Sequence, residues 1–253
     1  RFDHEEIKEV MDLCLTCKGC TSECPSNVDM ASLKAEFLHQ YYRSNGVPFR
    51  ARLFSNLDRF NRLGSYWPGL YNFLLQNSTT SGLVKRAMGI ASQRQLPKVH
   101  ATSVRAWFRK HQPVPPAKIK QTVYLFCDEF TNYNDSPIGI KAIQLLNKLG
   151  YQVKLVAHAE SGRAAISKGL LKQAKRYAEE NVELFATLVL AESPLVGIEP
   201  SAILSFRDEY PRLVREDLRE AAKSLADYSF TIEEFLAAEF RAGRITSADF
   251  HQK

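Results

Sequence analysis

Four cysteines lie within eleven residues near the start of the sequence, and they restrict what this chain can be. The run reads Cys14-Leu-Thr-Cys17-Lys-Gly-Cys20-Thr-Ser-Glu-Cys24-Pro25. Its spacing, C-x2-C-x2-C-x3-C-P, is the one with which closely set thiolates surround a [4Fe–4S] cube. The run therefore predicts an iron–sulfur site, and a chain that transfers electrons rather than one that makes or breaks bonds itself.

The short gaps between the cysteines let successive thiolates converge on one cube, and Gly19 permits backbone conformations closed to other residues. We expect Cys14, Cys17, Cys20 and Cys24 to be the cofactor-binding and metal-ligating residues. In ferredoxins with two clusters, however, the fourth cysteine of each run ligates the other cluster. Because the sequence holds a single run, Cys24 either completes the same cube or serves a neighbouring one.

A structural zinc ion is the main alternative for this run. Zinc sites more often use two separated pairs of ligands or include histidines at regular spacing, and neither pattern accompanies the run. A secreted disulfide framework would have its cysteines dispersed and even in number, whereas this chain has five, four of them clustered. The fifth, Cys127, follows an apolar stretch and is expected to be a buried thiol.

At 253 residues the chain is long enough for two units. No stretch approaches the roughly 18 apolar residues that span a bilayer, and the first residues lack the layout of a signal peptide. We therefore expect a cytoplasmic protein, either free or peripheral at the membrane. The absence of an initiator methionine suggests a piece of a longer polypeptide.

Charge divides the chain in two. Residues 1–120 contain 18 Lys and Arg against 9 Asp and Glu, whereas residues 121–253 contain 16 against 19. From Arg59 to Lys120 there are eleven basic residues and no acidic one. Such a stretch attracts phosphate, anionic lipid or an acidic protein surface, or it is a solvated docking face for another domain. It matches no nucleic-acid-binding module, so no nucleic acid is expected as a partner.

The apolar pattern predicts helices before the change of charge and alternating strands and helices after it. Strands are expected at 122–127, at 151–157 and at either 188–191 or 195–198, and a turn at 78–82. Alternation of this kind favours a parallel sheet covered by helices. The fold class is therefore α+β with two domains. Residues 1–112 form an all-helical, ferredoxin-type iron–sulfur domain, 113–120 a Pro-rich linker, and 121–253 an α/β domain.

The cysteine run is followed by Ser26–Ala31 and Leu33–Phe37. With these segments the chain resembles the C-terminal iron–sulfur region of FAD-linked dehydrogenases, fusion proteins similar to those that oxidise D-lactate, glycolate or D-2-hydroxyglutarate. The second half contains four further segments: Asp128–Tyr133, Ser161–Gly169, Gly197–Ser201 and Arg207–Pro211. With them it resembles the cysteine-rich CCG domain of those proteins and of related subunits of anaerobic glycerol-3-phosphate dehydrogenase and heterodisulfide reductase.

The sequence departs from that family at the cysteines that name the CCG domain. Where the family places a cysteine pair, this chain has Glu160-Ser161, and Ala202 stands where another cysteine is frequent. The resemblance thus implies the first half of a CCG domain with its cysteines lost. The cysteine segment that the family has upstream, with which Cys24 would be shared, is absent from this sequence.

The resemblance implies an electron-transfer region that receives electrons from a flavin (FAD) domain outside this chain and passes them to a downstream acceptor. No catalytic residue is expected in the chain itself. Two other interpretations stay open: a stand-alone iron–sulfur subunit of a multi-protein oxidoreductase, and a non-catalytic zinc-binding interaction module.

Several polar residues lie at or just after predicted strand ends, where open α/β sheets place their ligand sites: His158, Glu160, Ser161, Arg163, Glu199 and Ser201. They could form a small pocket for an anion or carboxylate around Arg163. The alternative is structural: Glu199-Pro-Ser201 as a helix cap and Arg163 in an ion pair.

Overall fold

The computed structural model describes residues 3–111 and 118–250. They form two compact units, which are described separately. The first comprises the residues up to Leu57 together with Gly162–Tyr177, and the second comprises Asp58–Ser161 together with the residues from Ala178 onward. Most of the predicted Pro-rich linker lies outside the described residues. This grouping by packing does not test the division into domains 1–112 and 121–253, which stays a prediction.

The first unit is helical. Its elements are α1 (Glu5–Asp12), α2 (Gly19–Glu23), α3 (Met30–Asn45), α4 (Phe49–Phe54), α11 (Arg163–Ser167) and the first part of α12 (Leu171–Phe185). Helix α3 begins where the Asp29 side chain accepts a hydrogen bond from the Ser32 N–H at 3.0 Å. The segment after α11 approaches α3 very closely. A Cβ at Gly169, whose φ is +69°, would lie 2.4 Å from the Leu38 Cβ, so only glycine fits there.

The second unit begins with further helices: α5 (Leu57–Gly64), α6 (Pro68–Gln76), α7 (Ser78–Met88) and α8 (Val104–His111). The predicted turn at 78–82 is wrong, because these residues form the start of α7. Asn77 caps that helix by accepting hydrogen bonds from the N–H groups of Thr79 and Thr80. The Ser and Thr residues that suggested a turn are thus also those favoured near a helix start.

A four-stranded parallel sheet lies at the centre of the second unit. Its strands are β1 (Gln121–Phe126), β2 (Tyr151–Lys154), β3 (Leu195–Gly197) and β4 (Ser229–Thr231), in the order β2-β1-β3-β4. Val123 lies opposite Val153, and Phe126 lies opposite Gly197. The prediction of a parallel sheet is confirmed, and 195–198 is the right choice for the third strand.

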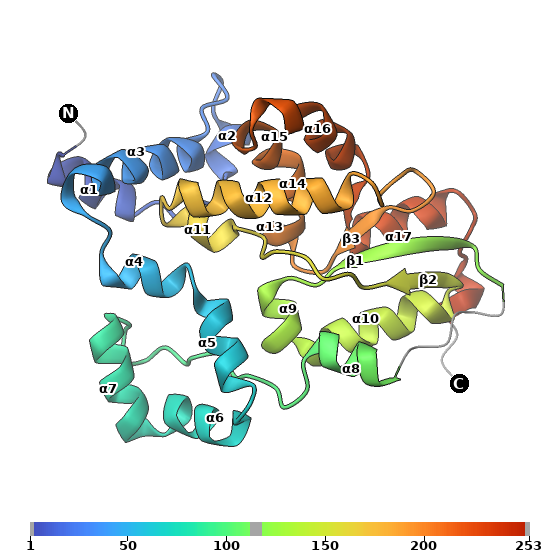
Figure 1. The fold of residues 1–253 in the computed structure, drawn as a ribbon, viewed down its shortest axis with the longest axis horizontal. Helices are drawn as coiled ribbons and strands as arrows, with labels where there is room; N and C mark the ends of the chain where they lie inside the picture. Colours follow the sequence, from blue (N-terminus) through green and yellow to red (C-terminus); the bar gives the residue numbers. More distant parts are fainter. Residues whose placement is uncertain (1–2, 112–117, 251–253) are drawn as a thin grey trace. The chain divides into compact units, whose positions relative to one another are not determined.

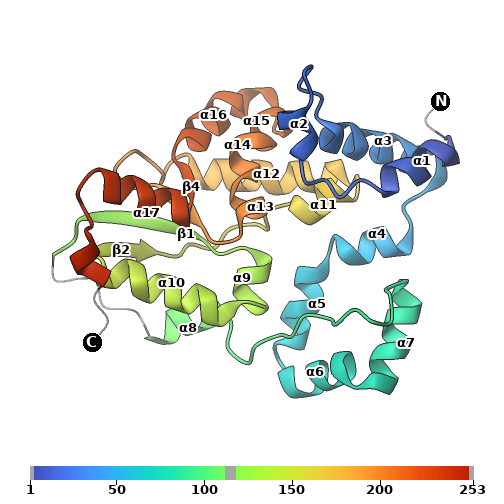
Figure 2. The same cartoon turned by 180° about the vertical axis from the view of Figure 1, so that it is seen from behind.

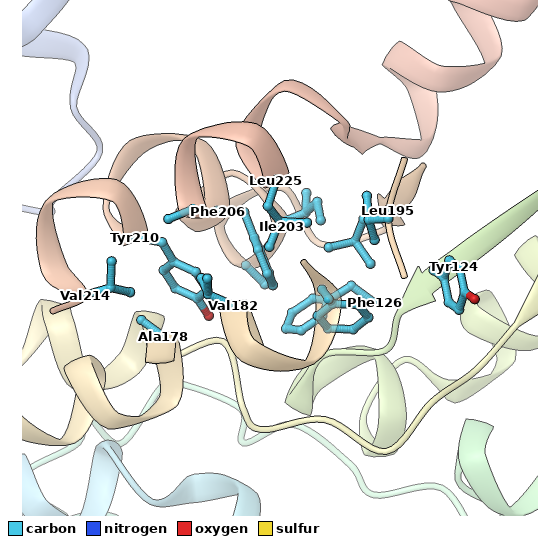
Figure 3. Packing of buried hydrophobic residues seen from close by; sticks show 14 residues of the cluster. Tyr124, Phe126, Ala178, Val182, Leu195, Ile203, Phe206, Tyr210, Val214 and Leu225 are labelled. Carbon is cyan, nitrogen blue, oxygen red and sulfur yellow. The ribbon is translucent and has the colours of Figure 1, made fainter. Parts of the chain in front are cut away.

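Helices cover both faces of this sheet (Figures 1 and 2). One face packs on α8, α10 (Ser136–Lys148) and α17 (Ile232–Arg241), and its core includes Val123, Ile143 and Phe235. The other face packs on the last turns of α12 and on α13 (Pro200–Ile203), α14 (Ser205–Asp208), α15 (Tyr210–Leu213) and α16 (Arg219–Asp227). There Phe126 meets Phe206, with ring centroids 4.9 Å apart (Figure 3).

The remaining elements of the second unit are α9 (Glu129–Tyr133) and the short 3-10 helices η1 (Glu216–Leu218) and η2 (Ser247–Phe250). Both α9 and α10 follow β1 along the chain, so the segment after β1 turns at the carboxyl edge of the sheet. Among the described helices, none is long and apolar enough to cross a membrane.

The helices and the parallel strands of the second unit confirm the α+β class in its mixture of the two kinds of element.

Candidate functional site

The cysteine run forms a loop between α1 and α3 that is interrupted by the short helix α2. Cys14 and Cys17 precede α2, Cys20 lies within it, and Cys24 directly follows its last residue. All four thiols are free of disulfides; Cys17 is exposed and the other three are half-buried. The structure thus places the four predicted ligands on one short, accessible stretch of chain.

The backbone of this loop is unusual. Thr16, Lys18 and Asn27 have φ values of +55°, +61° and +50°, and in the described parts of the chain no other non-glycine residue has a positive φ. Residues held in such sparsely populated conformations cost free energy and cluster at ligand-binding sites. Between the first two of these residues lies Cys17. The loop also directs the Thr16 N–H at the Cys14 sulfur, with N and Sγ 3.4 Å apart.

Two cationic side chains hold the carbonyl groups of the same loop. The Lys34 Nζ, on α3, donates to the Cys14 carbonyl at 2.7 Å, and the Arg163 Nη2, on α11, donates to the Thr16 carbonyl at 2.8 Å. Lys34 is only 7% exposed, which is rare for a lysine. These contacts fix the loop and bring two positive charges to its backbone.

Backbone N–H groups surround the thiol of Cys24. Backbone N–H groups of Val28, Ser26 and Asn27 lower the pKa of Cys24, because they stabilise the thiolate. A thiolate, not a thiol, is the form that binds metal. The sequence leaves open which cluster Cys24 would serve. In the structure, the surroundings of Cys24 favour the thiolate.

The donor set of the loop suits an iron–sulfur cluster in its chemistry. It offers four thiols, an N–H aimed at one sulfur and two cations that offset the negative charge of thiolate ligands. The thiols are not gathered around one point, since no three or more His, Cys, Asp or Glu side chains in the described residues are placed to hold a metal ion. The assignment of the four ligands therefore stays a prediction.

Three large apolar side chains close to Cys14 in the sequence are exposed. Val10 is 67% exposed, and Leu13 and Leu15, on either side of Cys14, are 81% and 86% exposed. Single exposed apolar residues are normal, but a group of them at one place marks an interaction surface. The exposed apolar residues therefore give this segment the character of a contact surface.

A second group of polar residues lies in the second unit, where β1 and β2 end. A cavity of about 170 Å³ is lined there by Cys127, His158, Arg62 and Arg105, and by four carboxyl groups, those of Asp58, Asp128, Glu129 and Glu160. Of the predicted pocket residues, the structure brings His158 and Glu160 to this cavity. Arg163 and Glu199 are absent from its lining.

His158 is held in one tautomer. Its Nε2 lies 3.2 Å from the Cys127 N–H nitrogen and 2.9 Å from the Arg105 Nη2, both donors, and its Nδ1 lies 2.6 Å from the Ala159 carbonyl oxygen. Nε2 therefore accepts and Nδ1 carries the proton. Burial and the neighbouring Arg105 guanidinium lower the pKa of His158 to about 3. The imidazole is neutral and structural.

The acidic groups of the cavity are also engaged within the protein. The Glu129 carboxylate accepts from the Ser161 hydroxyl at 2.7 Å and from the Ser161 N–H at 3.1 Å. Burial and the Asp58 carboxylate raise the pKa of Glu160 to about 8. Cys127 is buried, as predicted, and burial raises the pKa of its thiol to about 12, so it is not a reactive thiolate.

The structural interpretation of Glu199 as a helix cap is confirmed. Glu199 caps α13 by accepting from the Ala202 N–H at 2.6 Å and from the Ser201 hydroxyl at 2.7 Å. The Arg163 side chain instead donates to the cysteine loop. The sequence suggested a common site because these polar residues lie close to predicted strand ends. A helix that begins just after a strand also needs polar capping residues at its start, and Glu199 serves as such a cap.

Comparison with known proteins places this chain beside two kinds of dehydrogenase. It is 27% identical over 224 residues to the D-2-hydroxyglutarate dehydrogenase of Haemophilus influenzae, a match that covers 85% of this chain and 22% of the relative. The corresponding Escherichia coli (strain K12) protein is 26% identical over 89% of this chain. One subunit of the anaerobic glycerol-3-phosphate dehydrogenase of E. coli K12 is 26% identical over 70% of this chain and 45% of its own length.

The chain is homologous to a segment of these dehydrogenases. It spans about a fifth of the length of the D-2-hydroxyglutarate dehydrogenases that it matches. The predicted resemblance to both kinds of protein is thereby confirmed. No protein-family model matches the chain, and no solved structure matches it either.

Sequence reasoning missed the two contacts that support the cysteine loop, although it named Arg163 as a candidate for a different role. Lys34 and Arg163 lie 20 and 147 positions from the carbonyl groups that they hold. Lys34 lies on the buried side of α3, where the other buried residues are apolar. A lysine at such a position is the only signal in the sequence that could have marked Lys34 as a supporting residue.

Proposed function

We propose that this chain is an electron-transfer region in which Cys14, Cys17, Cys20 and Cys24 bind a [4Fe–4S] cluster. The observation that supports this most is the loop itself: four free thiols on a strained backbone that Lys34 and Arg163 fix from two helices. The helical segment around it would then be a ferredoxin-type iron–sulfur domain. The cluster, when bound, supplies one-electron chemistry.

The residues of the chain tune and hold that site. The Thr16 N–H directed at the Cys14 sulfur stabilises negative charge on sulfur, and hydrogen bonds of this kind raise the reduction potential of a thiolate-bound centre. Lys34 and Arg163 act in the same direction through their charge. Burial of Lys34 keeps its charge from being screened by solvent.

We further propose that the electrons come from a flavin (FAD) partner and leave to a downstream acceptor. The relatives are named dehydrogenases and a dehydrogenase subunit, and this chain holds only part of their length. The exposed Val10, Leu13 and Leu15 provide an apolar surface beside the cysteines on which such a partner could pack. A 2-hydroxy acid as substrate and the cytoplasm as location belong to the same proposal.

A ligand substitution tests the proposed site. The chain, purified without oxygen and reconstituted with iron and sulfide, is expected to be brown, and Cys17→Ser is expected to remove most of its visible absorbance because one thiolate ligand is lost. Cys127→Ala is the matched control, since that thiol is buried and distant in sequence from the run. Its absorbance should equal that of the wild-type chain.

Unchanged absorbance of Cys17→Ser would show that the ligands are assigned wrongly. A colourless wild-type protein with stoichiometric zinc would favour the zinc-binding interaction module instead.

A further inference from the structure

The second unit contains a larger cavity of about 550 Å³, bounded by α5, α8 and the segments around α9 and after β2. Its volume is within the range of small-molecule sites, roughly 300–1,000 Å³. Three arginines line it: Arg62, Arg105 and Arg109. Phe108 and Leu155 contribute an apolar wall. None of these residues is part of the cysteine loop.

The charged residues that line this cavity are all positive. No Asp or Glu is among its lining residues. Across the residues that the structure describes, Arg62, Arg105 and Arg109 form no ion pair with a carboxylate. Arg62 and Arg105 also border the smaller acidic cavity described above, which offsets part of their charge on that side. On the side of the larger cavity, the three arginines are the only charged lining residues.

Arg105 is held in place by uncharged partners. Its Nη2 lies 2.9 Å from the His158 Nε2 and 3.3 Å from the Cys127 carbonyl oxygen, and its backbone N–H donates to the Asn132 side chain at 3.1 Å. These contacts fix the guanidinium without neutralising it, since His158 is neutral. A preorganised guanidinium loses little side-chain entropy when an oxyanion binds.

Further basic residues of the same stretch of chain add to the positive electrostatic potential of this region. The stretch from Arg59 to Lys120, which supplies most of α5 and all of α8, has eleven basic residues and no acidic one. Arginine is suited to bidentate recognition of carboxylate and phosphate groups. A ligand here would place its anionic groups on the arginines and its carbon skeleton on Phe108 and Leu155.

We propose that this cavity binds a small organic oxyanion, with a carboxylate or phosphate group on Arg62, Arg105 and Arg109 and an apolar body against Phe108 and Leu155. The proposal is independent of the iron–sulfur assignment. It concerns a different unit, and the binding it describes does not require the cysteines.

Calorimetric titration of the full chain with three probes tests this: phenyl phosphate, glutarate and inorganic phosphate. We expect phenyl phosphate or glutarate to bind with one-to-one stoichiometry and more tightly than inorganic phosphate, because only they contact the apolar wall. Which of the two binds better distinguishes a phosphate from a carboxylate ligand. Each probe should bind to Cys17→Ser with the affinity that it has for the wild-type chain.

The variant Arg62→Ala/Arg109→Ala should weaken binding about tenfold or more, since charge-assisted hydrogen bonds are lost. Both side chains are exposed, so the fold should persist, and Arg109→Ala alone serves if the double variant is unstable. Arg86→Ala, on the exposed side of α7, should bind as the wild type does. Equal affinity of the cavity variants and Arg86→Ala, or no binding of any probe at about 10 mM, would overturn the proposal.

Discussion

At the scale of the residue, His158 makes the free energy of unfolding depend on pH. Its ring stacks on Phe126, with centroids 4.3 Å apart, and both ring nitrogens are engaged in hydrogen bonds. Burial and Arg105 lower its pKa from 6.5 to about 3. An unfolded chain therefore binds a proton to this residue at a higher pH than the folded chain does.

This predicts the sign of a pH effect. Because the folded pKa is lowered, the stability due to neutral His158 is complete above pH 6.5 and is lost as the pH falls toward about 3. The slope is at most about 1.4 kcal/mol per pH unit in that window. Chemical denaturation of the wild type and of His158→Gln between about pH 7.5 and about pH 4, a range that covers most of this window, isolates this contribution.

The difference in free energy of unfolding between the two proteins should shrink as the pH falls. A difference that stays constant with pH would show that His158 titrates alike in both states. The comparison with the variant is needed because Asp128 and Glu129, whose pKa values burial raises, change stability in the opposite direction.

At the scale of the element, helix α17 depends on a capping box at its start. The Thr231 hydroxyl accepts from the Glu234 N–H at 3.2 Å, and the Glu234 carboxylate accepts from the Thr231 N–H at 3.0 Å. Thr231→Ala should lower the free energy of unfolding by about 1 kcal/mol, because the Glu234 N–H loses its partner and the box is broken. Glu233→Gln, an exposed change in the same turn, should stay within about 0.5 kcal/mol of the wild type.

The contact between β3 and α13 has no space for a larger residue. A Cβ at Gly197 would lie 2.4 Å from the Ile203 Cβ, and Ile203 is completely buried. Gly197→Ala should therefore lower the melting temperature, at a cost of about 1–3 kcal/mol for overpacking. Gly82→Ala, where a Cβ meets nothing within 4 Å, should leave thermal unfolding unchanged or raise its midpoint. Equal midpoints for both variants would contradict this packing.

The sequence predicted some elements better than others, and length explains the difference. β1 and α10 are long and strongly apolar, with 6 and 13 residues, so their patterns are clear. β4 has only three residues, Ser229–Thr231, and pairs with β3 far away in the sequence. Its strand character comes from that pairing, which no local pattern records.

At the scale of the whole molecule, the four cysteines proposed as ligands stand out by their spacing in the sequence, whereas the contacts that support their loop do not. The thiols lie close together in sequence, so the motif is local. Lys34 and Arg163 reach the loop only because the chain folds α3 and α11 into the same unit.

The [4Fe–4S] cluster proposed for the cysteine run can be detected by spectroscopy. The decisive experiment is electron paramagnetic resonance of the chain, purified without oxygen and reduced with dithionite, together with iron and sulfide analysis. We expect about four iron and four sulfide per chain and a cluster signal that disappears in Cys17→Ser. A protein without iron, silent after reduction and loaded with one zinc ion, would contradict it.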